Sequence, residues 1–310
     1  MMFADGSGVR VAYVPETDFG VTPATPAFKT GRVTSGGLRT NKTTVTSDER
    51  QADRNVRDEI LTGLGAGGTY NFEFAAGDFM DTLLSCALRG AWASDVLKND
   101  VLAPSLTIEE TLELGATDSF SRFPGSMVNT LSLSIGAREK VTGSVALLSQ
   151  KEILSTSIVT GATYTAPGTD PIANASNNVA ALTVGTINPA PRIKTLSLEV
   201  NNGLRQRPEV GSLYSSIFGA DRCNVTGSIA AYFESNALYQ AVLAHGSAAL
   251  SFTLGVDAGK RYSFVLPKIR FGDGERAVGG NTDDVMVNIP FRAIFDPVTA
   301  CSIQVTRNVA

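Results

Sequence analysis

A short pattern of alternating apolar and small polar residues occurs twice in this chain, and it restricts the possible folds more than any other feature. Residues 130–135 (TLSLSI) are echoed by residues 195–200 (TLSLEV), and residues 141–146 (VTGSVA) by residues 225–230 (VTGSIA). Alternation puts every second side chain on the same face of a strand, so all four segments are predicted to be β-strands. A unit that recurs within one chain indicates either two copies of a domain or one sheet built from similar pieces.

The composition agrees with a globular, mainly β protein. The chain has 310 residues, 43% of them hydrophobic and 18% charged, which is enough for two domains with cores of their own. Thirty glycines and thirteen prolines favour short strands joined by turns over long helices. We therefore expect a mainly β (α+β) fold.

The sequence contains no pattern typical of catalysis, of metal binding or of tight nucleic-acid binding. The net charge is −4, and no stretch concentrates lysine and arginine as a protein that grips phosphates would. Cys86, Cys223 and Cys301 lie far apart without a CxxC pair, so we interpret them as buried reduced thiols. The glycine-rich residues 63–68 precede an alternating strand rather than a helix, unlike a nucleotide-binding loop. We expect no cofactor, no metal and no enzymatic activity.

The chain also lacks the signals of secretion and of membrane insertion. Its first residues have neither the charged start nor the apolar run of a signal peptide. No window of about 20 residues is apolar enough to span a bilayer. We therefore expect a protein that folds in the cytoplasm and contacts no membrane.

Two helices are predicted, one in each half of the chain. Residues 77–88 carry an apolar stripe that includes Leu83, and residues 234–245 carry one that includes Leu243. A cation followed by glycine ends both segments, which suits the helix dipole and a left-handed terminal turn. We expect both stripes to be buried, and the only histidine, His245, to be a helix-end residue rather than a catalytic group.

The elements follow the same order in both halves, which predicts tandem domains. Residues 1–28 contain prolines and glycines without sustained periodicity, so we expect an extended N-terminal arm there. A first domain is expected at 29–155 and a second at 191–310. Between them, residues 156–190 are rich in Thr, Ala, Asn and Pro and predict a linker with one possible strand.

Two long charged loops interrupt the strand pattern. Residues 40–65 and 203–221 carry charges of both signs and few apolar residues to hold them in a core. Loops longer than about 12–15 residues are usually functional or disordered in compact domains, and mixed charge suits a partner surface with the complementary pattern. We predict contacts with other molecules at Asp48, Glu49, Arg50, Asp53, Arg54, Arg57, Arg205, Arg207 and Glu209.

Several short motifs span most of the chain in a fixed order. They are Leu38-Arg39 at the start of the first loop, residues 75–78 (AAGD) entering a helix, residues 123–125 (FPG) before the strand at 128–133 (VNTLSL), residues 141–144 (VTGS), residues 201–205 (NNGLR) and residues 225–228 (VTGS). In this order the chain resembles the major tail tube proteins of long-tailed (siphovirus-type) bacteriophages, here in a two-domain form.

The resemblance implies two tandem tail-tube-like β-sandwich domains, each with one flanking α-helix. It implies a structural virion protein, assembled in the bacterial host cytoplasm into rings that stack as the tail tube, the conduit for DNA ejection. The implied partners are other copies of the chain, the tape measure protein, and the tail terminator and tip proteins. DNA would pass through the lumen without specific binding, and the charged loops would make contacts between subunits or between rings.

The number of chains in a ring depends on which domains line the lumen. If both domains supply inner strands, three chains form a ring with pseudo-sixfold symmetry; if only one does, six chains are needed. We favour the trimer because the second half keeps the long loop, the helix and the final alternating strand. The alternative function is a surface- or carbohydrate-binding β-sandwich module of a virion or secreted assembly. Such a module would need aromatic residues clustered on loops, whereas Trp92 follows a predicted helix.

Overall fold

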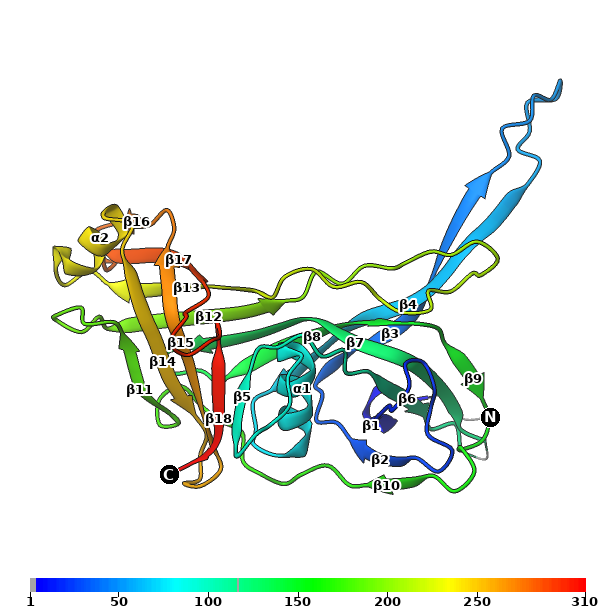
Figure 1. Cartoon of the computed structure of the whole chain (residues 1–310), viewed down its shortest axis with the longest axis horizontal. Helices are drawn as coiled ribbons and strands as arrows, with labels where there is room; N and C mark the ends of the chain where they lie inside the picture. The colour runs from blue at the N-terminus through cyan, green and yellow to red at the C-terminus, as the bar shows by residue number, and fades with distance from the viewer. Residues whose placement is uncertain (1–3, 116) are drawn as a thin grey trace.

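The computed structural model describes residues 4–115 and 117–310 and confirms a mainly β fold (Figure 1). The helices are α1 (Asp78–Leu88) and α2 (Asn236–Leu243), with a 3-10 turn at Gly6–Gly8. No helix within the described residues is long and apolar enough to cross a membrane. The strands are β1 (Val9–Pro15), β2 (Ala27–Thr30), β3 (Ser35–Thr46), β4 (Glu59–Glu73), β5 (Val96–Lys98), β6 (Leu106–Leu112), β7 (Ser119–Gly136), β8 (Thr142–Ser149), β9 (Ile153–Ser155), β10 (Thr163–Thr165), β11 (Val179–Val184), β12 (Ile193–Asn201), β13 (Asn224–Tyr232), β14 (Ser247–Leu254), β15 (Arg261–Phe271), β16 (Glu275–Ala277), β17 (Met286–Ala293) and β18 (Gln304–Val309).

A long antiparallel sheet runs through both halves of the chain. Its strand order is β3-β4-β8-β7-β12-β13-β17, and both β16 and the end of β15 pair with the far side of β17. Alternation along β7, β12 and β17 puts apolar side chains on one face and small or polar ones on the other. The apolar face of this long sheet is one wall of the hydrophobic core, which is continuous between the two halves.

Two outer sheets complete the core, one in each half. The first has the order β9-β7-β6-β1-β2-β10, and the second has the order β11-β14-β15-β18-β5. Strand β7 belongs to two sheets because it is 18 residues long: its start pairs with β6 and β9, and its end with β8 and β12. Strand β15 changes sheets in the same way, pairing first with β18 and then with β17.

The second half repeats the pairing scheme of the first. In this scheme β11 corresponds to β1, β12 to β3, β13 to β4, β14 to β6, β17 to β8 and β18 to β9. The place of β7 is taken by β15 together with β16. The echoed segments TLSLSI and TLSLEV are therefore not equivalent positions in two copies. They lie in β7 and β12, which are direct neighbours, with Leu133 opposite Leu198. Both segments obey the same alternation because they are pieces of one sheet.

The VTGS motif has the same packing role at both of its positions. Gly143 lies opposite Phe72 of β4, and Gly227 lies opposite Phe291 of β17. A Cβ atom at either glycine would overlap the phenylalanine ring across the strand pair. Glycine is therefore required at this place in the motif because a neighbouring strand fills it with an aromatic ring.

Both helices end in the left-handed turn that the sequence predicts. Arg89 and His245 have φ angles of 52° and 47°, and each precedes a glycine. The hydroxyl of Ser235 accepts a hydrogen bond from the first turn of α2 and caps that helix. His245 is thus a helix-end residue.

The two helices are buried to different extents. Leu83 of α1 is 3% exposed, whereas Leu243 of α2 is 70% exposed, so the prediction that Leu243 lies in the core is wrong for the single chain. Leu238 is the buried residue of α2. Leu243 follows it by five residues, roughly 140° further round the helix at about 100° per residue, and therefore faces away.

The predicted arm and linker contain strands of the outer sheets. Residues 1–28, expected to be an extended arm, include β1, whose buried residues are Ala12, Tyr13 and Val14 together with Val11. A strand that is buried on both faces shows no alternation, which explains why periodicity failed to reveal it. Residues 156–190 contain β10 and β11, against the one strand expected. Residues 1–3 of the expected arm lie outside the described residues.

Candidate assembly interface

Strands β3 and β4 form a hairpin arm that projects beyond the first half of the molecule (Figure 1). Strand β8 pairs with β4 only from Ala66 to Glu73, so the outer part of the arm is a two-stranded ribbon. Its strand residues are mostly exposed, including Val45, Ile60 and Leu61. A two-stranded ribbon is marginally stable by itself in water, so the outer part of the arm gains little stability from its own chain.

The tip of the arm, residues 47–58, holds six of the predicted contact residues. All six are exposed: Asp48, Glu49, Arg50, Asp53, Arg54 and Arg57. Arg57 donates to the Asp53 carboxylate at 2.8 Å, four residues away. Exposed pairs of this kind contribute only about 0–1 kcal/mol, so the tip presents its charges to solvent without being held by them.

The loop at 203–221 crosses from the second half onto the first half of the same chain (Figure 1). The N–H of Leu64, at the root of the arm, donates to the carbonyl of Leu213 at 2.8 Å. The ring of Phe218 packs edge-on against Phe19, with 5.4 Å between the ring centroids. The loop backbone is therefore anchored within its own chain.

The charged residues of this loop remain on its outer surface. Arg205, Arg207 and Glu209 are exposed; Arg205 forms a backbone bridge with Gly219, and Glu209 accepts from the hydroxyl of Ser216. The structure does not bring them together with the six tip residues, because the loop reaches only the root of the arm and the tip extends past it (Figure 1).

The two halves meet at a seam formed by β7 and β12. The pairs run from Gly136 opposite Thr195 to Thr130 opposite Asn201, and helix α1 contacts both strands. Asn202, directly after β12, is 1% exposed. Its side-chain amide donates to carbonyl oxygens of α1 and β7, those of Ala87 at 2.9 Å and Val128 at 3.0 Å. This residue therefore holds the helix and both strands of the seam together.

Helix α1 is also tied to the second outer sheet. The carboxylate of Asp81 accepts hydrogen bonds from the Tyr262 hydroxyl at 2.8 Å and from Arg307 at 2.6 Å. The guanidinium of Arg307 lies 4.7 Å from the ring centre of Trp92, whose N–H donates to the Asp81 carbonyl. The single tryptophan is thus engaged at the seam rather than displayed on a ligand-binding loop. Sequence reasoning did not identify the seam, although its two strands are the echoed segments TLSLSI and TLSLEV, for which one sheet built from similar pieces was an open alternative.

The long sheet ends in two unpaired edges within the described residues. Strand β3 pairs with β4 alone, and β16 pairs with β17 alone. An exposed strand edge presents a row of unpaired N–H and C=O groups, which favours pairing with another chain. These edges are the candidate assembly sites of the chain.

The other face of the long sheet carries small hydroxyl side chains near the seam. The hydroxyls of Ser132 and Ser144 are hydrogen bonded at 2.7 Å, and those of Ser197 and Ser228 at 2.8 Å. Glu199 lies on the same face, and an ion pair joins Glu73 of that face to Lys140. Arg270 and Arg292 also lie on this face, which therefore carries charges of both signs among its hydroxyls.

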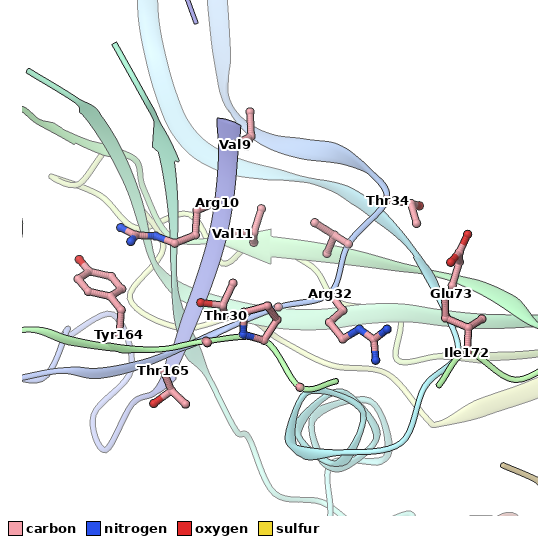
Figure 2. Close-up of a pocket in the computed structure, with 15 residues that line it drawn as sticks. Val9, Arg10, Val11, Thr30, Arg32, Thr34, Glu73, Tyr164, Thr165 and Ile172 are labelled. Atoms are coloured by element: carbon pink, nitrogen blue, oxygen red, sulfur yellow. The ribbon is translucent and has the colours of Figure 1, made fainter. Parts of the chain in front are cut away.

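A groove of about 670 Å³ lies beside β1 in the first half (Figure 2). Its cations are engaged: Arg10 stacks 4.0 Å from the Tyr164 ring centre, and Arg32 donates to the carbonyl of Asp170 at 2.5 Å. Its one carboxylate, Glu73, pairs with Lys140. The Tyr164 hydroxyl donates to the Glu109 carboxylate at 2.6 Å, and burial raises the pKa of this tyrosine, so its hydroxyl is a weak nucleophile.

Two of the three cysteine thiols are weak nucleophiles. Burial raises the pKa of the Cys86 thiol to about 12 and that of Cys223 to about 11, so both remain protonated and weakly nucleophilic. In the part of the chain that the structure describes, no three His, Cys, Asp or Glu side chains form a group that could hold a metal ion.

A comparison with protein families supports the resemblance seen in the sequence. Residues 6–293 match the family described as phage tail tube protein. A comparison with curated proteins gave no match. The family match implies a structural role in the tail of a bacteriophage virion and self-assembly into a tube. Since it covers nearly the whole sequence, the chain belongs to the phage tail tube protein family.

Proposed function

We propose that three copies of this chain close into a ring and that such rings stack into the tail tube through which DNA is ejected into the host. The observation that carries the proposal is the repeat within the long sheet. The units β3-β4-β8-β7 and β12-β13-β17-β16 follow one another in the same order, joined by the pairing of β7 with β12. Adding further units in the same way leaves an open edge at each end until the sheet closes on itself.

The participation of both units favours three chains per ring. Each unit supplies strands to the same long sheet, so neither unit is a domain attached only to the outer surface. Two tail-tube-like units per chain then produce a trimer with pseudo-sixfold symmetry, the shape that the family resemblance implies. In this reading the first unit includes β1 to β9 and the second includes β11 to β18.

The polar face of the long sheet would line the lumen. Within residues 4–115 and 117–310 no outer sheet covers this face, and its hydroxyls near the seam bond to one another across neighbouring strands. Tight binding to DNA requires several Lys or Arg contacts to phosphates. On this face the arginines, such as Arg270 and Arg292, are interspersed with carboxylates and hydroxyls, so DNA would pass without being held.

The hairpin arm would join one ring to the next or one subunit to another. Its exposed apolar residues and the mixed charges at its tip need a surface that a single chain does not supply. The tape measure protein inside the tube, and the terminator and tip proteins at its ends, are the further partners that the resemblance implies. Synthesis and assembly would take place in the host cytoplasm.

Negative-stain electron microscopy of the purified chain tests this function. Rings, or tubes built from rings, are the expected particles. A chain that stays monomeric at high concentration, and in the presence of preformed tail tips, would refute the proposal.

A further inference from the structure

We infer that residues 273–279 of one chain pair in antiparallel fashion with residues 35–41 of a second copy, with Glu275 opposite Arg39. This inference rests on the proposed ring and specifies its subunit interface. Its template is the seam between β7 and β12, where the same kind of contact is already formed inside one chain.

The first step is to find which residues of β16 and β7 hold equivalent places. Leu133 of β7 lies opposite Gly143 of β8, and Arg276 of β16 lies opposite Val287 of β17. Strand β8 pairs with β4, and β17 pairs with β13 in the same way. Gly143 and Val287 are equivalent, because each is the second paired residue of its strand. Arg276 therefore holds the place of Leu133.

The second step does the same for β3 and β12. Leu38 lies opposite Gly68 of β4, and Leu198 lies opposite Gly227 of β13. The pairing of β4 with β8 ends at Glu73, and that of β13 with β17 ends at Tyr232. Gly68 and Gly227 precede these residues by the same number of positions and are therefore equivalent. Leu38 therefore holds the place of Leu198.

The intrachain seam then determines the register between chains. Because Leu133 pairs with Leu198 inside the chain, Arg276 pairs with Leu38 of the next copy. The flanking pairs are Glu275 with Arg39 on one side and Ala277 with Gly37 on the other. The strand directions agree, since β16 runs antiparallel to β17 just as β7 runs antiparallel to β8.

Charge complementarity supports this register independently. It places an anion, Glu275, directly opposite a cation, Arg39, although neither residue entered the derivation. Both are exposed, and within the described residues neither takes part in an ion pair. A shift of one residue would instead oppose Glu275 to Leu38 or Thr40 and leave Arg39 without its partner.

An exposed apolar residue occurs where the template buries its equivalent. Val278 of the open edge is 75% exposed, whereas Ile135, which holds the same place in β7, is 7% exposed. A second copy docked as the template dictates would cover Val278.

The backbone of β3 is oriented for the inferred pairing. The N–H of Leu38 donates to the Glu110 carboxylate at 2.8 Å, so it points away from β4 and toward the open edge. In the inferred pairing, this N–H would donate to the carbonyl oxygen of Arg276 in the second copy instead of to Glu110. In the second half, where β7 covers the corresponding edge, the place of Glu110 is occupied by Phe252. Glu110 thus shields the edge of the free chain from indiscriminate pairing.

Helix α2 lies where it can cover the new seam. Helix α1 contacts both strands of the intrachain seam, and α2 rests on β16, with the Arg276 guanidinium 4.8 Å from the ring centre of Tyr239. Docking of β3 from the next chain would complete the surface under α2, as β12 does under α1.

A pair of cysteines tests the register. Since Leu38 and Arg276 would exchange hydrogen bonds, the flanking pair Gly37 and Ala277 is of the non-hydrogen-bonded type, whose side chains are closest and suit a disulfide. Gly37→Cys with Ala277→Cys, in a Cys223→Ser background, should form interchain disulfides in assembled protein under mild oxidation. The ladder on a non-reducing gel should end at three chains.

Two controls make the result specific. Gly37→Cys with Arg276→Cys puts the thiols on opposite faces of the sheet and should cross-link at least tenfold less. The matched pair Gly37→Ser with Ala277→Ser should fold and form tubes without cross-links. Equal cross-linking of both cysteine pairs would refute the register.

Charge reversal provides a second, independent readout. Arg39→Glu or Glu275→Arg alone opposes like charges and should raise the critical concentration for assembly by up to about fivefold, the factor for one cross-strand charge pair. The double reversal should restore it. Additive losses in the double variant would overturn the proposed pair.

The outcomes separate this inference from the function on which it rests. Tubes that form normally but do not cross-link at residues 37 and 277 would overturn the interface and leave the tube function intact. Absence of rings and tubes from the unmodified chain and from the serine control would overturn both.

Discussion

Replacing Asn202 with alanine should destabilise the isolated chain by about 3 kcal/mol. The side-chain amide donates to the carbonyl oxygens of Ala87 and Val128 in a site where the residue is 1% exposed. Ala87 lies in the last turn of α1, where carbonyls have no partner within the helix. A buried acceptor that loses its donor costs about 1–3 kcal/mol, so two of them cost roughly 2–4 kcal/mol after partial relaxation.

Thermal and urea unfolding of the monomer measure this loss. With an unfolding entropy of about 2.1 cal/mol/K per residue, 3 kcal/mol lowers the Tm of this chain by roughly 5 °C. The matched control is Asn201→Ala, whose side chain accepts one hydrogen bond from the Gly203 N–H at an exposed turn, and it should cost less than about 1 kcal/mol. Equal losses for the two variants, or a loss below about 0.5 kcal/mol for Asn202→Ala, would refute the seam argument.

The other predictions concern the core, the arm and the thiols. Leu83→Asp should destabilise the fold by several kcal/mol because it buries a charge without a partner, whereas Leu243→Asp should leave the melting curve of the monomer unchanged. Glu109→Gln removes the buried anion that pairs with Arg122 at 2.7 Å and should cost about 3–5 kcal/mol in urea unfolding; Asp53→Asn, at the exposed tip, should cost less than about 1 kcal/mol. Replacing residues 45–60 with a Gly-Ser link should leave a folded subunit that forms no tubes, and intact tubes from that variant in electron micrographs would contradict the role of the arm. Burial raises the pKa of Cys86 to about 12, so alkylation at pH 8 should spare it in the native chain and modify it after unfolding, as mass spectrometry would show.

The sequence predicts this fold best where one face of a strand is buried. The segments at 130–135 and 195–200 alternate cleanly because their leucines face the core and their serines face the open side of the long sheet. The same reasoning failed at β1, which is buried on both faces and shows no alternation. It failed at Leu243 because an apolar stripe does not reveal how much of a short helix its own chain covers.

The assembly surfaces were only partly accessible to sequence reasoning. Charge pattern and loop length indicated the tip of the arm, because exposed mixed charge is visible in the sequence itself. The seam and the two open edges depend on which strands pair, and pairing partners far apart in the chain leave no local pattern. Arg39 and Glu275 look like ordinary surface charges until the register of the long sheet places them on opposite edges.

The rotational symmetry of an assembled tube, measured by cryo-electron microscopy, tests the central claim most directly. The account predicts threefold symmetry with a pseudo-sixfold wall, in which alternate strand-to-strand seams are the β7–β12 contact and the contact between residues 273–279 and 35–41. True sixfold symmetry, with six chains per ring and only one unit of each chain facing the lumen, would contradict it.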